Sequence, residues 1–486
     1  MKKFGIIGSG VAGLSAAVHL RAAGNEVTVF EANDYPGGKL TAFEQDGFRF
    51  DAGPSLFTMP QLLDSVFEVA GKNPRDYYDF IRVDPGCHYF WEDGTQFEAP
   101  SEINAFARKA EETFGVSPEI VRKYIEDSFE LYDITEDVFL KNSLHKLSTY
   151  LKLSTAKSFA QLYKAHLFSS MHEVNASKLK HPKLIQFFNR YATYNGSNPY
   201  KAPGTLTVVP TLEFRWGTFL PKGGMHEITQ SLFRLAQDIG VKFHFDEKVE
   251  RIRTSGNSTE GLVTAKGRYD FDAVVSNMDV IPTYRYLLPD HQAPKRVEKQ
   301  ERSSSALIYY WGIEEQFHEL GLHNIFWSEE YEKEFSYLFE KKDIIDDPTI
   351  YVNITSKHET QDAPDGGENW FVMVNAPQVN GQDWNAVEKR TRKNIIAKLS
   401  RMLGRDIEPM IKTEKILDPP TIESQTSSYL GSLYGTSSND RLSAFLRHPN
   451  FTPMIKNLYF CGGSVHPGGG IPLCLLSGKI VGDIAS

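Results

Sequence analysis

Residues 4–31 read FGIIGSGVAGLSAAVHLRAAGNEVTVFE, and this stretch decides the fold. A short β-like run leads into Gly8, Gly10 and Gly13, spaced as GxGxxG, and a helix-like run follows. In a dinucleotide-binding turn, the first glycine permits the bend, the second admits a pyrophosphate, and the third lets the helix pack closely on the strand. A second β-like run ends at Glu31, where a carboxylate can accept ribose hydroxyls. The stretch therefore predicts the strand, turn, helix and strand of an α/β nucleotide-binding domain.

Two other interpretations of the same stretch are a secretory leader and a purely structural use of the glycines. Lys2 and Lys3 precede the apolar run 4–20, and small residues follow it, as in a leader. The glycine spacing between a strand and a helix, together with Glu31 at the end of the next strand, favours the nucleotide site over both.

Composition is that of an ordinary globular protein. The chain has 486 residues, a net charge of −9, 41% hydrophobic residues and a mean hydropathy of −0.37. This length suits about two to four domains, and the acidic balance gives no reason to expect nucleic acid as a partner. We find no charge-free apolar stretch long enough for a spanning helix. Cys87, Cys461 and Cys474 lack metal-ligand spacing and are expected to be buried thiols in a reducing compartment.

One segment departs from the acidic average. Between Lys141 and Lys201 there are ten lysines and arginines but one acid, Glu173, and leucines and phenylalanines are interleaved with them. Such a pattern suits an amphipathic surface on an anionic membrane. A solvated helical face over an ordinary core suits it equally well. Nucleic acid is a poorer third choice because no recognition motif accompanies the charges.

The end of the chain carries a second glycine-rich motif. Residues 457–486 read NLYFCGGSVHPGGGIPLCLLSGKIVGDIAS, which predicts a strand, a loop and a helix that starts near Ile471. Glycines at 462, 463, 468, 469 and 470 permit close approach of the backbone to a ligand. The N-terminus of the helix offers N–H groups to an anionic or electron-rich group. A purely structural loop is the alternative.

Further motifs lie between the two ends of the chain. They are PGGKL (36–40), FDAGPS (50–55), PKGG (221–224), DEKVERI (246–252) and DAVVSNMD (272–279). With GxGxxG before them and CGGSVHPGGGIPL after them, this order resembles the FAD-dependent carotenoid desaturases of the phytoene desaturase type. The resemblance covers essentially the whole chain, and the terminal motif is its most specific part. The closest branch is that of the bacterial hydroxycarotenoid 3,4-desaturases.

The resemblance implies a fold and a division of the chain. The expected fold is α/β with a flavin amine oxidase-like architecture. Residues 1–85, 215–290 and 440–486 would form a discontinuous Rossmann-like FAD-binding domain. Residues 86–214 would be a mainly helical region for membrane association and substrate entry, and residues 291–439 a sheet-plus-helix domain that binds the substrate.

The resemblance also implies which residues bind FAD. Lys39 stands where many relatives have arginine, so the planar two-point contact of arginine with phosphate is in doubt here. The implied contacts are Gly8, Ser9, Gly10, Ala12 and Gly13 for the pyrophosphate, Glu31 for the adenosine ribose, Val249 for the adenine, Gly38 and Lys39 for the phosphates or flavin, Pro54, Ser55, Gly470 and Ile471 for the isoalloxazine, Gly463 for the ribityl or pyrophosphate portion, and Asn277 in the strand-end motif.

Few residues offer themselves for acid–base chemistry. His466 is a candidate for proton handling or for orienting a substrate hydroxyl, because a neutral imidazole can do either near physiological pH. A histidine that only fixes the terminal loop is the more favoured alternative. For the substrate lining, the first aromatic candidates are Phe57, Trp311, Phe326 and Trp327, although aromatic residues in such runs are more often core.

The resemblance implies FAD-dependent desaturation of a carotenoid, with 3,4-desaturation of a 1-hydroxylated acyclic end group as the leading expectation. Alternatives are a phytoene or C30 carotenoid desaturase, a carotenoid oxygenase or isomerase, and a non-catalytic isoprenoid carrier. Expected partners are the carotenoid, a membrane surface, and quinone or oxygen as electron acceptor. The expected location is the cytoplasm, with peripheral attachment to the inner membrane through the basic 141–201 segment.

Overall fold

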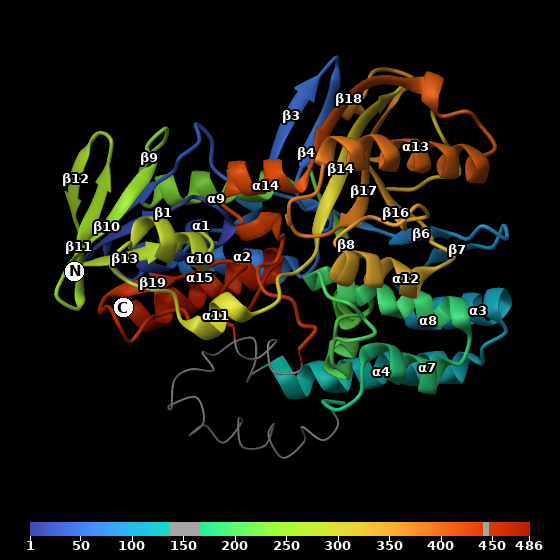
Figure 1. Cartoon of the computed structure of the whole chain (residues 1–486), viewed down its shortest axis with the longest axis horizontal. Coiled ribbons are helices and arrows are strands. Elements are labelled where there is room, and N and C mark those ends of the chain that lie inside the picture. Colours follow the sequence, from blue (N-terminus) through green and yellow to red (C-terminus); the bar gives the residue numbers. More distant parts are fainter. Residues whose placement is uncertain (137–165, 441–446) are drawn as a thin grey trace.

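The structure is a computed structural model that describes residues 1–136, 166–440 and 447–486. The nucleotide-binding stretch forms the centre of a five-stranded sheet whose neighbouring strands are all parallel (Figure 1). The turn after the central strand therefore opens at the carboxyl edge of the sheet, where such folds bind ligands. In spatial order the strands are β19 (Leu458–Phe460), β13 (Ala273–Ser276), β1 (Lys3–Ile7), β2 (Glu26–Phe30) and β9 (Lys242–His244).

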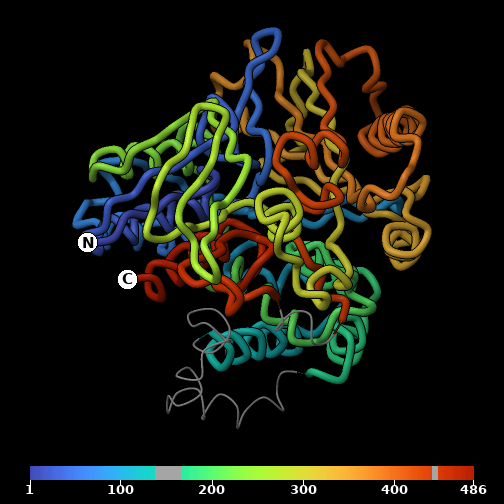
Figure 2. Tube along the Cα trace, turned by 60° about the vertical axis from the view of Figure 1, so that its left-hand side comes forward, coloured from blue at the N-terminus to red at the C-terminus, as the bar shows by residue number. Residues whose placement is uncertain are grey.

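The two ends of the chain pack against each other through α1 (Val11–Ala22) and α15 (Ile471–Ala485). Ser15 Oγ donates to the carbonyl of Leu475 over 2.9 Å, and a Cβ on Gly478 would lie 2.6 Å from the Ser15 Cβ. Only glycine permits this approach of the two helices. Both termini consequently lie close together (Figure 2). The core of this part is completed by α2 (Pro60–Val69) and α9 (Glu227–Asp238).

A second sheet has seven strands. All its neighbours are antiparallel except β15 and β6, which are parallel. Its strands, in spatial order, are β18 (Ile411–Leu417), β14 (Ser305–Ile313), β17 (Glu368–Ala376), β16 (Ile350–Ile354), β15 (His323–Phe326), β6 (Cys87–Phe90) and β7 (Gln96–Ala99). The last two belong to the region expected to be mainly helical, and their place in this sheet was not foreseen. The domain limits given above stay a prediction.

The two faces of the seven-stranded sheet have different neighbours. Leu307, Tyr309 and Trp311 of β14 pack with residues of α13 (Trp384–Leu403), which covers the outer face (Figure 1). The intervening Ile308 belongs to the opposite face, because successive side chains of a strand point to opposite sides. That inner face turns toward the ligand cavity described below.

Four helices form a layer beside the second sheet (Figure 1). They bury an aromatic core that includes Phe106, Phe187 and Phe188. The threefold and fourfold apolar spacing in this part of the sequence predicted helices, and the described portion has them. They are α3 (Ile103–Phe114), α4 (Pro118–Thr135), α7 (Met171–Leu179) and α8 (Pro182–Asn189). Among the described residues, no helix is both long and apolar enough to cross a membrane.

Smaller elements connect these layers. A hairpin of β3 (Thr41–Gln45) and β4 (Phe48–Ala52) stands beside the second sheet. Asp51 of β4 accepts hydrogen bonds from the backbone N–H groups of Met225 (2.8 Å) and His226 (3.1 Å), just before α9. The remaining pieces are β5 (Phe80–Val83), β8 (Thr218–Pro221), β10 (Val249–Ser255), β11 (Ser258–Thr264), β12 (Gly267–Asp270), α10 (Val280–Pro282), α11 (Lys295–Lys299), α12 (Tyr331–Ser336) and α14 (Pro419–Thr426).

Candidate functional site: a cavity between two sheets

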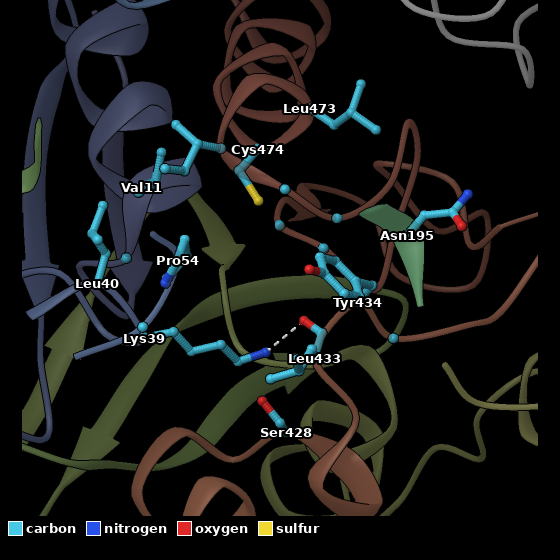
Figure 3. A pocket seen from close by; sticks show the side chains of 18 of the residues that line it. Val11, Lys39, Leu40, Pro54, Asn195, Ser428, Leu433, Tyr434, Leu473 and Cys474 are labelled. Atoms are coloured by element: carbon cyan, nitrogen blue, oxygen red, sulfur yellow. Dashed lines mark hydrogen bonds between the residues drawn. The ribbon is translucent and has the colours of Figure 1, made fainter. Parts of the chain in front are cut away.

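A cavity of about 950 Å³ is lined by residues of both sheets and of the helical layer. Its size is at the upper end of the range of small-molecule sites. In Figure 3, Val11, Leu40 and Pro54 come from the N-terminal part of the chain, whereas Tyr434 and Cys474 come from its C-terminal part. The cavity therefore lies where segments distant in the sequence meet.

The glycine turn after β1 forms one wall of the cavity, and Asn277 packs against it. Gly8 has φ +90°, a conformation that L side chains rarely adopt. A Cβ on Gly10 would lie 2.8 Å from Asn277 Nδ2, and a Cβ on Gly13 would lie 2.2 Å from the Gly8 carbonyl. On its other side, Asn277 Oδ1 is 3.0 Å from the Cβ position of Gly462. Asn277 thus lies between the N-terminal and C-terminal glycine motifs.

Glu31 directly follows β2 at the cavity wall and is held by four hydrogen bonds. Ser9 donates to Oε2 through its backbone N–H (2.8 Å) and its hydroxyl (2.7 Å). Asn33 donates to Oε1 through its backbone N–H (3.0 Å) and its side chain (3.0 Å). Glu31 as a residue is only 6% exposed, and it lines the cavity. The network fixes an acceptor of hydrogen bonds next to the glycine turn.

Lys39 extends along the cavity and donates from Nζ to the carbonyl of Leu433 over 3.0 Å (Figure 3). Burial lowers the pKa of Lys39, and the charge of Asp279 partly offsets this effect. Arg447 supplies a second cation, which donates to the carbonyls of Tyr434 (2.9 Å) and Gly463 (3.1 Å). Burial, reinforced by the charge of another arginine, lowers the pKa of Arg447 to about 10. At this pKa Arg447 remains positively charged at neutral pH, which suits a site for an anionic ligand.

The N-terminus of α15 opens into the cavity. Gly470, with φ +99°, is its N-cap, and Ile471 and Pro472 form its first turn. The free N–H groups of this turn and the positive end of the helix dipole favour an anionic or electron-rich group. The sequence predicted this arrangement of glycine loop and helix start.

The structure brings together most of the residues implied to bind FAD. Ser9 and Gly13 are the exceptions: Ser9 is fully buried against Glu31, and Gly13 packs on the turn. They support the site without lining it. The residues that do line the cavity are Gly8, Gly10, Ala12, Glu31, Gly38, Lys39, Pro54, Ser55, Val249, Asn277, Gly463, Gly470 and Ile471.

His466 is buried in the terminal loop and is not among the residues that line the cavity. Its carbonyl accepts hydrogen bonds from Asn450 Nδ2 (2.8 Å) and Ser477 Oγ (3.0 Å), and its N–H donates to the carbonyl of His448 (2.9 Å). These contacts are made by the backbone of His466, so the role of its ring stays a prediction.

The inner face of the second sheet supplies polar groups that sequence reasoning missed. Ser55 Oγ and the Tyr351 hydroxyl are 2.8 Å apart, and the same hydroxyl is 2.7 Å from His323 Nδ1. All three residues line the cavity. Burial lowers the pKa of His323 to about 3, so its imidazole is neutral at physiological pH. No local pattern in the sequence marks Tyr351 or His323.

A buried ion pair lies in the same part of the cavity. Arg190 donates to both carboxylate oxygens of Glu213 at 3.2 Å and to the Tyr194 hydroxyl at 3.0 Å. Tyr191 and Tyr194 also donate to Glu213. Burial acts to raise the pKa of Glu213, but the charge of Arg190 and the hydrogen bonds outweigh it and lower that pKa. The sequence contained one indication of this ion pair: Arg190 is the single charged residue in the stretch LIQFFNRYATY (184–194).

The aromatic residues expected to line the substrate site do not do so. Trp311 and Phe326 are on the outer face of the second sheet, Trp327 is in the aromatic core, and Phe57 is in the core below the parallel sheet. This expectation was wrong because all four side chains are buried in hydrophobic cores instead. The aromatic side chains that line it are Phe30, Tyr35, Tyr132, Tyr194, Tyr286, Tyr331, Tyr351, Phe371, Tyr429 and Tyr434.

The basic segment 141–201 falls partly outside the described residues. Within the described part, Lys178 pairs with Asp127 (2.8 Å), Lys201 pairs with Glu340 (2.9 Å), and Lys183 pairs with Asp93. Together with Arg190, these cations are neutralised by acids from elsewhere in the chain. A local charge count missed these partners, so the described part is less basic than the count suggested. Cys87 and Cys461 are buried thiols as expected, whereas Cys474 is partly exposed.

The residues at the cavity fit FAD. Glycines replace side chains where a pyrophosphate must approach the backbone, Glu31 offers a carboxylate for a ribose, and Lys39, Arg447 and the start of α15 offer positive charge for anionic portions. The arrangement defines a flavoprotein with a dinucleotide-binding domain and a ligand cavity against a second sheet.

Comparison with known proteins identifies the family. Residues 11–483 match the model of the flavin containing amine oxidoreductases. A 1-hydroxycarotenoid 3,4-desaturase from a Flavobacterium species is 52% identical over 484 residues, which cover 100% of this chain and 99% of that protein. A 4,4'-diapolycopene oxygenase from a Methylomonas species is 32% identical, with 98% of this chain and 97% of that protein covered. The structure of putrescine oxidase bound to putrescine has a TM-score of 0.63 at 16% identity, covering 99% of this chain and 98% of that one.

The chain therefore belongs to the flavin containing amine oxidoreductase family, and it is an FAD-dependent oxidoreductase. The expected architecture and cofactor are confirmed. When bound, FAD supplies the capacity to accept a hydride, while the protein binds and orients the substrate and excludes water. The buried inner face of the second sheet and the cavity beside it suit these tasks.

Proposed function

We propose that this protein desaturates a carotenoid, and that the bond is the 3,4 bond of a 1-hydroxylated acyclic end group. The observation that supports this most is the full-length, 52% identity to a 1-hydroxycarotenoid 3,4-desaturase. The cavity agrees with it: apolar side chains such as Ile308, Ile325 and Met373 line it, and polar groups gather in one part. A long apolar molecule with one polar end needs such a lining.

The proposed reaction removes two hydrogens from neighbouring carbons. One leaves as a hydride to FAD and the other as a proton, and the C3–C4 single bond becomes a double bond. Allylic C–H bonds of a polyene are activated by charge delocalisation, so holding the carbon chain in place supplies much of the catalysis. The two electrons taken from the substrate would have to leave the protein, and we propose quinone or oxygen as their acceptor.

We also propose that the cavity-lining residues named above bind FAD as the family resemblance implies. Glu31 holds the adenosine ribose, Gly10 lies at the pyrophosphate, and Ser55 and Ile471 lie at the isoalloxazine. The observations that support this assignment are the fixed Glu31 carboxylate, the missing side chains of the glycine turn and the start of α15 at the cavity. We also propose His466 for proton handling. This role requires that the terminal loop bring the imidazole ring to the substrate.

A carotenoid dissolves in lipid, so we propose that the protein takes it from the inner membrane, at whose cytoplasmic surface it binds reversibly. Interfacial binding needs apolar contact together with attraction of basic residues to anionic lipid. Liposomes with and without anionic lipid test this proposal: the protein should sediment with the anionic ones at low salt. Equal recovery in the supernatant for both kinds of liposome would contradict it.

The reaction is tested by mixing the FAD-loaded protein anaerobically with liposomes that carry either 1-hydroxylated or unmodified acyclic carotenoids. Flavin bleaching and the carotenoid spectrum are recorded together. We expect bleaching and a red-shifted product with the hydroxylated substrate. Reaction with phytoene instead would move the assignment to an earlier desaturation, and bleaching with neither substrate would contradict the desaturase proposal.

Oxygenation is a second candidate, because full-length relatives at 31–32% identity are named 4,4'-diapolycopene and 4,4'-diaponeurosporene oxygenases. The product mass separates the two reactions. Desaturation lowers the mass by two hydrogens, whereas oxygenation adds oxygen and requires air. A carrier without redox chemistry would show neither change and would purify without flavin absorbance.

A further inference from the structure

His323 has a buried ring nitrogen that the fold leaves without a partner. The side chain is 3% exposed, and its Nε2 atom has no hydrogen-bond partner among the described residues. Buried polar atoms are normally paired, and an exception in a cavity points to a ligand. Two polar groups, Tyr351 and Asn353, contact the ring's second nitrogen, Nδ1, and they determine which nitrogen carries the proton.

The neighbours of Nδ1 fix the tautomer of the ring. Asn353 Nδ2 is 3.0 Å from the carbonyl of Leu322 and 3.2 Å from His323 Nδ1. An amide nitrogen only donates, and its contact with a carbonyl settles the orientation of the amide. Nδ1 is therefore an acceptor, and the Tyr351 hydroxyl at 2.7 Å donates to it as well. Because the buried imidazole is neutral, its single proton is on Nε2.

This N–H belongs to the cavity side of the sheet. His323 and Ile325 of β15 line the cavity, whereas the intervening Asn324 and the following Phe326 do not. The alternation of side chains along a strand therefore places the His323 ring on the cavity face. Cys87, Arg190 and Glu213 also line the cavity. Burial has the largest effect on the pKa of His323, which it lowers, while the charge of Glu213 raises this pKa and that of Arg190 lowers it.

Two oxygen-bearing groups of this part of the cavity are engaged, whereas Arg190 Nε, like His323 Nε2, has no hydrogen-bond partner among the described residues. Glu213 is saturated by Arg190, Tyr191 and Tyr194, and the Tyr351 hydroxyl is shared between His323 and Ser55. His323 Nε2–H is thus a neutral, unpartnered donor on a side chain that lines the cavity. A carboxylate would have to meet the nearby negative charge of Glu213, so an uncharged hydroxyl fits better.

We propose that His323 recognises the terminal hydroxyl of the substrate by donating from Nε2–H to the hydroxyl oxygen, and that Tyr351 and Asn353 hold its ring in the donating tautomer. This inference rests on the proposed function, since it names the group that selects a 1-hydroxylated end. The class of ligand is a long apolar chain that ends in a tertiary alcohol.

The chemistry of the substrate supports this location. A hydroxyl on C1 is only two carbons from C3, so the group that binds it must lie close to the flavin. Ser55, for which the proposed cofactor position implies isoalloxazine contact, is connected to His323 through the Tyr351 hydroxyl. One hydrogen-bonded chain therefore links the proposed flavin side of the cavity to the proposed hydroxyl site.

The test compares two substitutions of His323. His323→Leu removes the donor and keeps an apolar side chain, whereas His323→Gln keeps an N–H near the position of Nε2. For wild type and each variant, binding of a hydroxylated and a non-hydroxylated acyclic carotenoid is measured under anaerobic conditions, together with kcat/KM for both. His358→Ala is the matched control, because His358 is a histidine that does not line the cavity.

We expect His323→Leu to weaken the preference for the hydroxylated carotenoid roughly 10- to 100-fold, while the non-hydroxylated one binds as before. His323→Gln should restore part of the preference, and His358→Ala should not change it. Tyr351→Phe removes the donor to Nδ1 and should weaken the preference less than His323→Leu does.

An unchanged preference in His323→Leu would overturn the inference and leave the desaturase proposal intact if wild type still bleaches its flavin with the hydroxylated substrate. Wild type that binds both carotenoids equally would also overturn it. FAD content and thermal unfolding show whether each variant folds. If His323→Leu does not fold, the Tyr351→Phe and His323→Gln variants decide: a preference unchanged in both would contradict the assignment.

Discussion

Glu31 ties the glycine turn to the end of the second strand, and it should determine the affinity for FAD. Glu31→Gln removes the negative charge that Ser9 and Asn33 surround with four donors. Hydrogen bonds to charged groups contribute about 1.5–3 kcal/mol each, so we expect FAD to bind roughly 10- to 100-fold more weakly. Titration of the apoprotein with FAD, followed by flavin fluorescence, measures this change.

Glu44→Gln is the control for that prediction, because Glu44 is an exposed glutamate of β3 that does not line the cavity. It should bind FAD as the wild type does. Thermal unfolding of both apoproteins separates a loss of ribose contact from a loss of fold. Equal FAD affinity in Glu31→Gln and Glu44→Gln would show that the carboxylate of Glu31 does not hold the cofactor.

At this scale, the sequence predicted the residues whose role is set by local spacing. Gly8, Gly10 and Glu31 belong to one strand, turn, helix and strand unit, so their positions follow from short-range geometry. His323 and Arg190 could not be found in this way. Their role depends on neighbours about 20 to 30 positions away in the chain, Tyr351 and Glu213, and no motif records those contacts.

At the scale of the elements, the second glycine of the PKGG motif before α9 is needed because the chain passes close to the FDAGPS motif there. A Cβ on Gly224 would lie 2.6 Å from both Asp51 Oδ2 and Arg49 Nη1, whereas a Cβ on Gly223 would meet nothing within 4 Å. Both glycines have positive φ, near +89° and +85°. Alanine at either site should cost about 1–2 kcal/mol for the backbone. Gly224→Ala should cost about 1–3 kcal/mol more, because it displaces a buried ion pair.

Denaturant unfolding of the two alanine variants checks this difference in the free energy of unfolding. Gly223→Ala is the matched control, since it carries the same backbone strain without the steric contact. Similar losses in the two variants would mean that the carboxylate of Asp51 does not need the space beside Gly224.

Helix α12 carries a carboxyl group that should make stability depend on pH. Glu334 is 1% exposed and accepts hydrogen bonds from Thr349 N–H (3.1 Å) and Oγ1 (2.7 Å), and burial raises its pKa to about 7. Between about pH 4.5 and pH 7 the folded protein keeps a proton that the unfolded chain has lost. The contribution of Glu334 to the free energy of unfolding therefore falls as the pH rises through this window.

Glu334→Gln stays uncharged, so its stability relative to wild type should rise by about 2–3 kcal/mol between pH 5 and pH 8. Denaturant unfolding at both pH values measures this change. Glu332→Gln, an exposed site on the same helix, should show no comparable rise. A Glu334→Gln variant whose advantage does not grow with pH would contradict the prediction.

At this scale, the sequence did not predict which residues of the second sheet face the cavity and which face the core. Residues 304–313, SSALIYYWGI, are rich in β-branched and aromatic residues, which predicts a strand, and they contain β14, in which every residue is buried. With apolar groups on both faces, the alternation that normally tells core from ligand side is absent from the sequence. Trp311 was therefore assigned to the substrate side, although it packs against α13.

Over the whole molecule, the cavity is built from segments at both ends of the chain. The turn at Gly8–Gly13 and the loop before α15 meet at Asn277, and α1 packs on α15 behind them. The resemblance to a family predicted that these motifs serve one cofactor. It could not predict the place of β6 and β7, because β6 pairs with β15, more than 200 residues away in the chain, and β7 joins the sheet through β6.

FAD should therefore stabilise both ends of the chain together. A ligand that binds only the folded state adds about 2.7 kcal/mol at 100 times its Kd, and local opening that breaks its site is suppressed by the same amount. Hydrogen exchange of the apoprotein and the FAD-loaded protein tests this coupling. Amides in 8–14 and in 462–474 should exchange more slowly, and in parallel, on addition of FAD.

Amides in α13, which covers the outer face of the second sheet away from the cavity, serve as the control and should change little. Slowing at the N-terminal turn alone would mean that the loop before α15 does not contact the cofactor, and the assignment of Gly463, Gly470 and Ile471 would then be wrong.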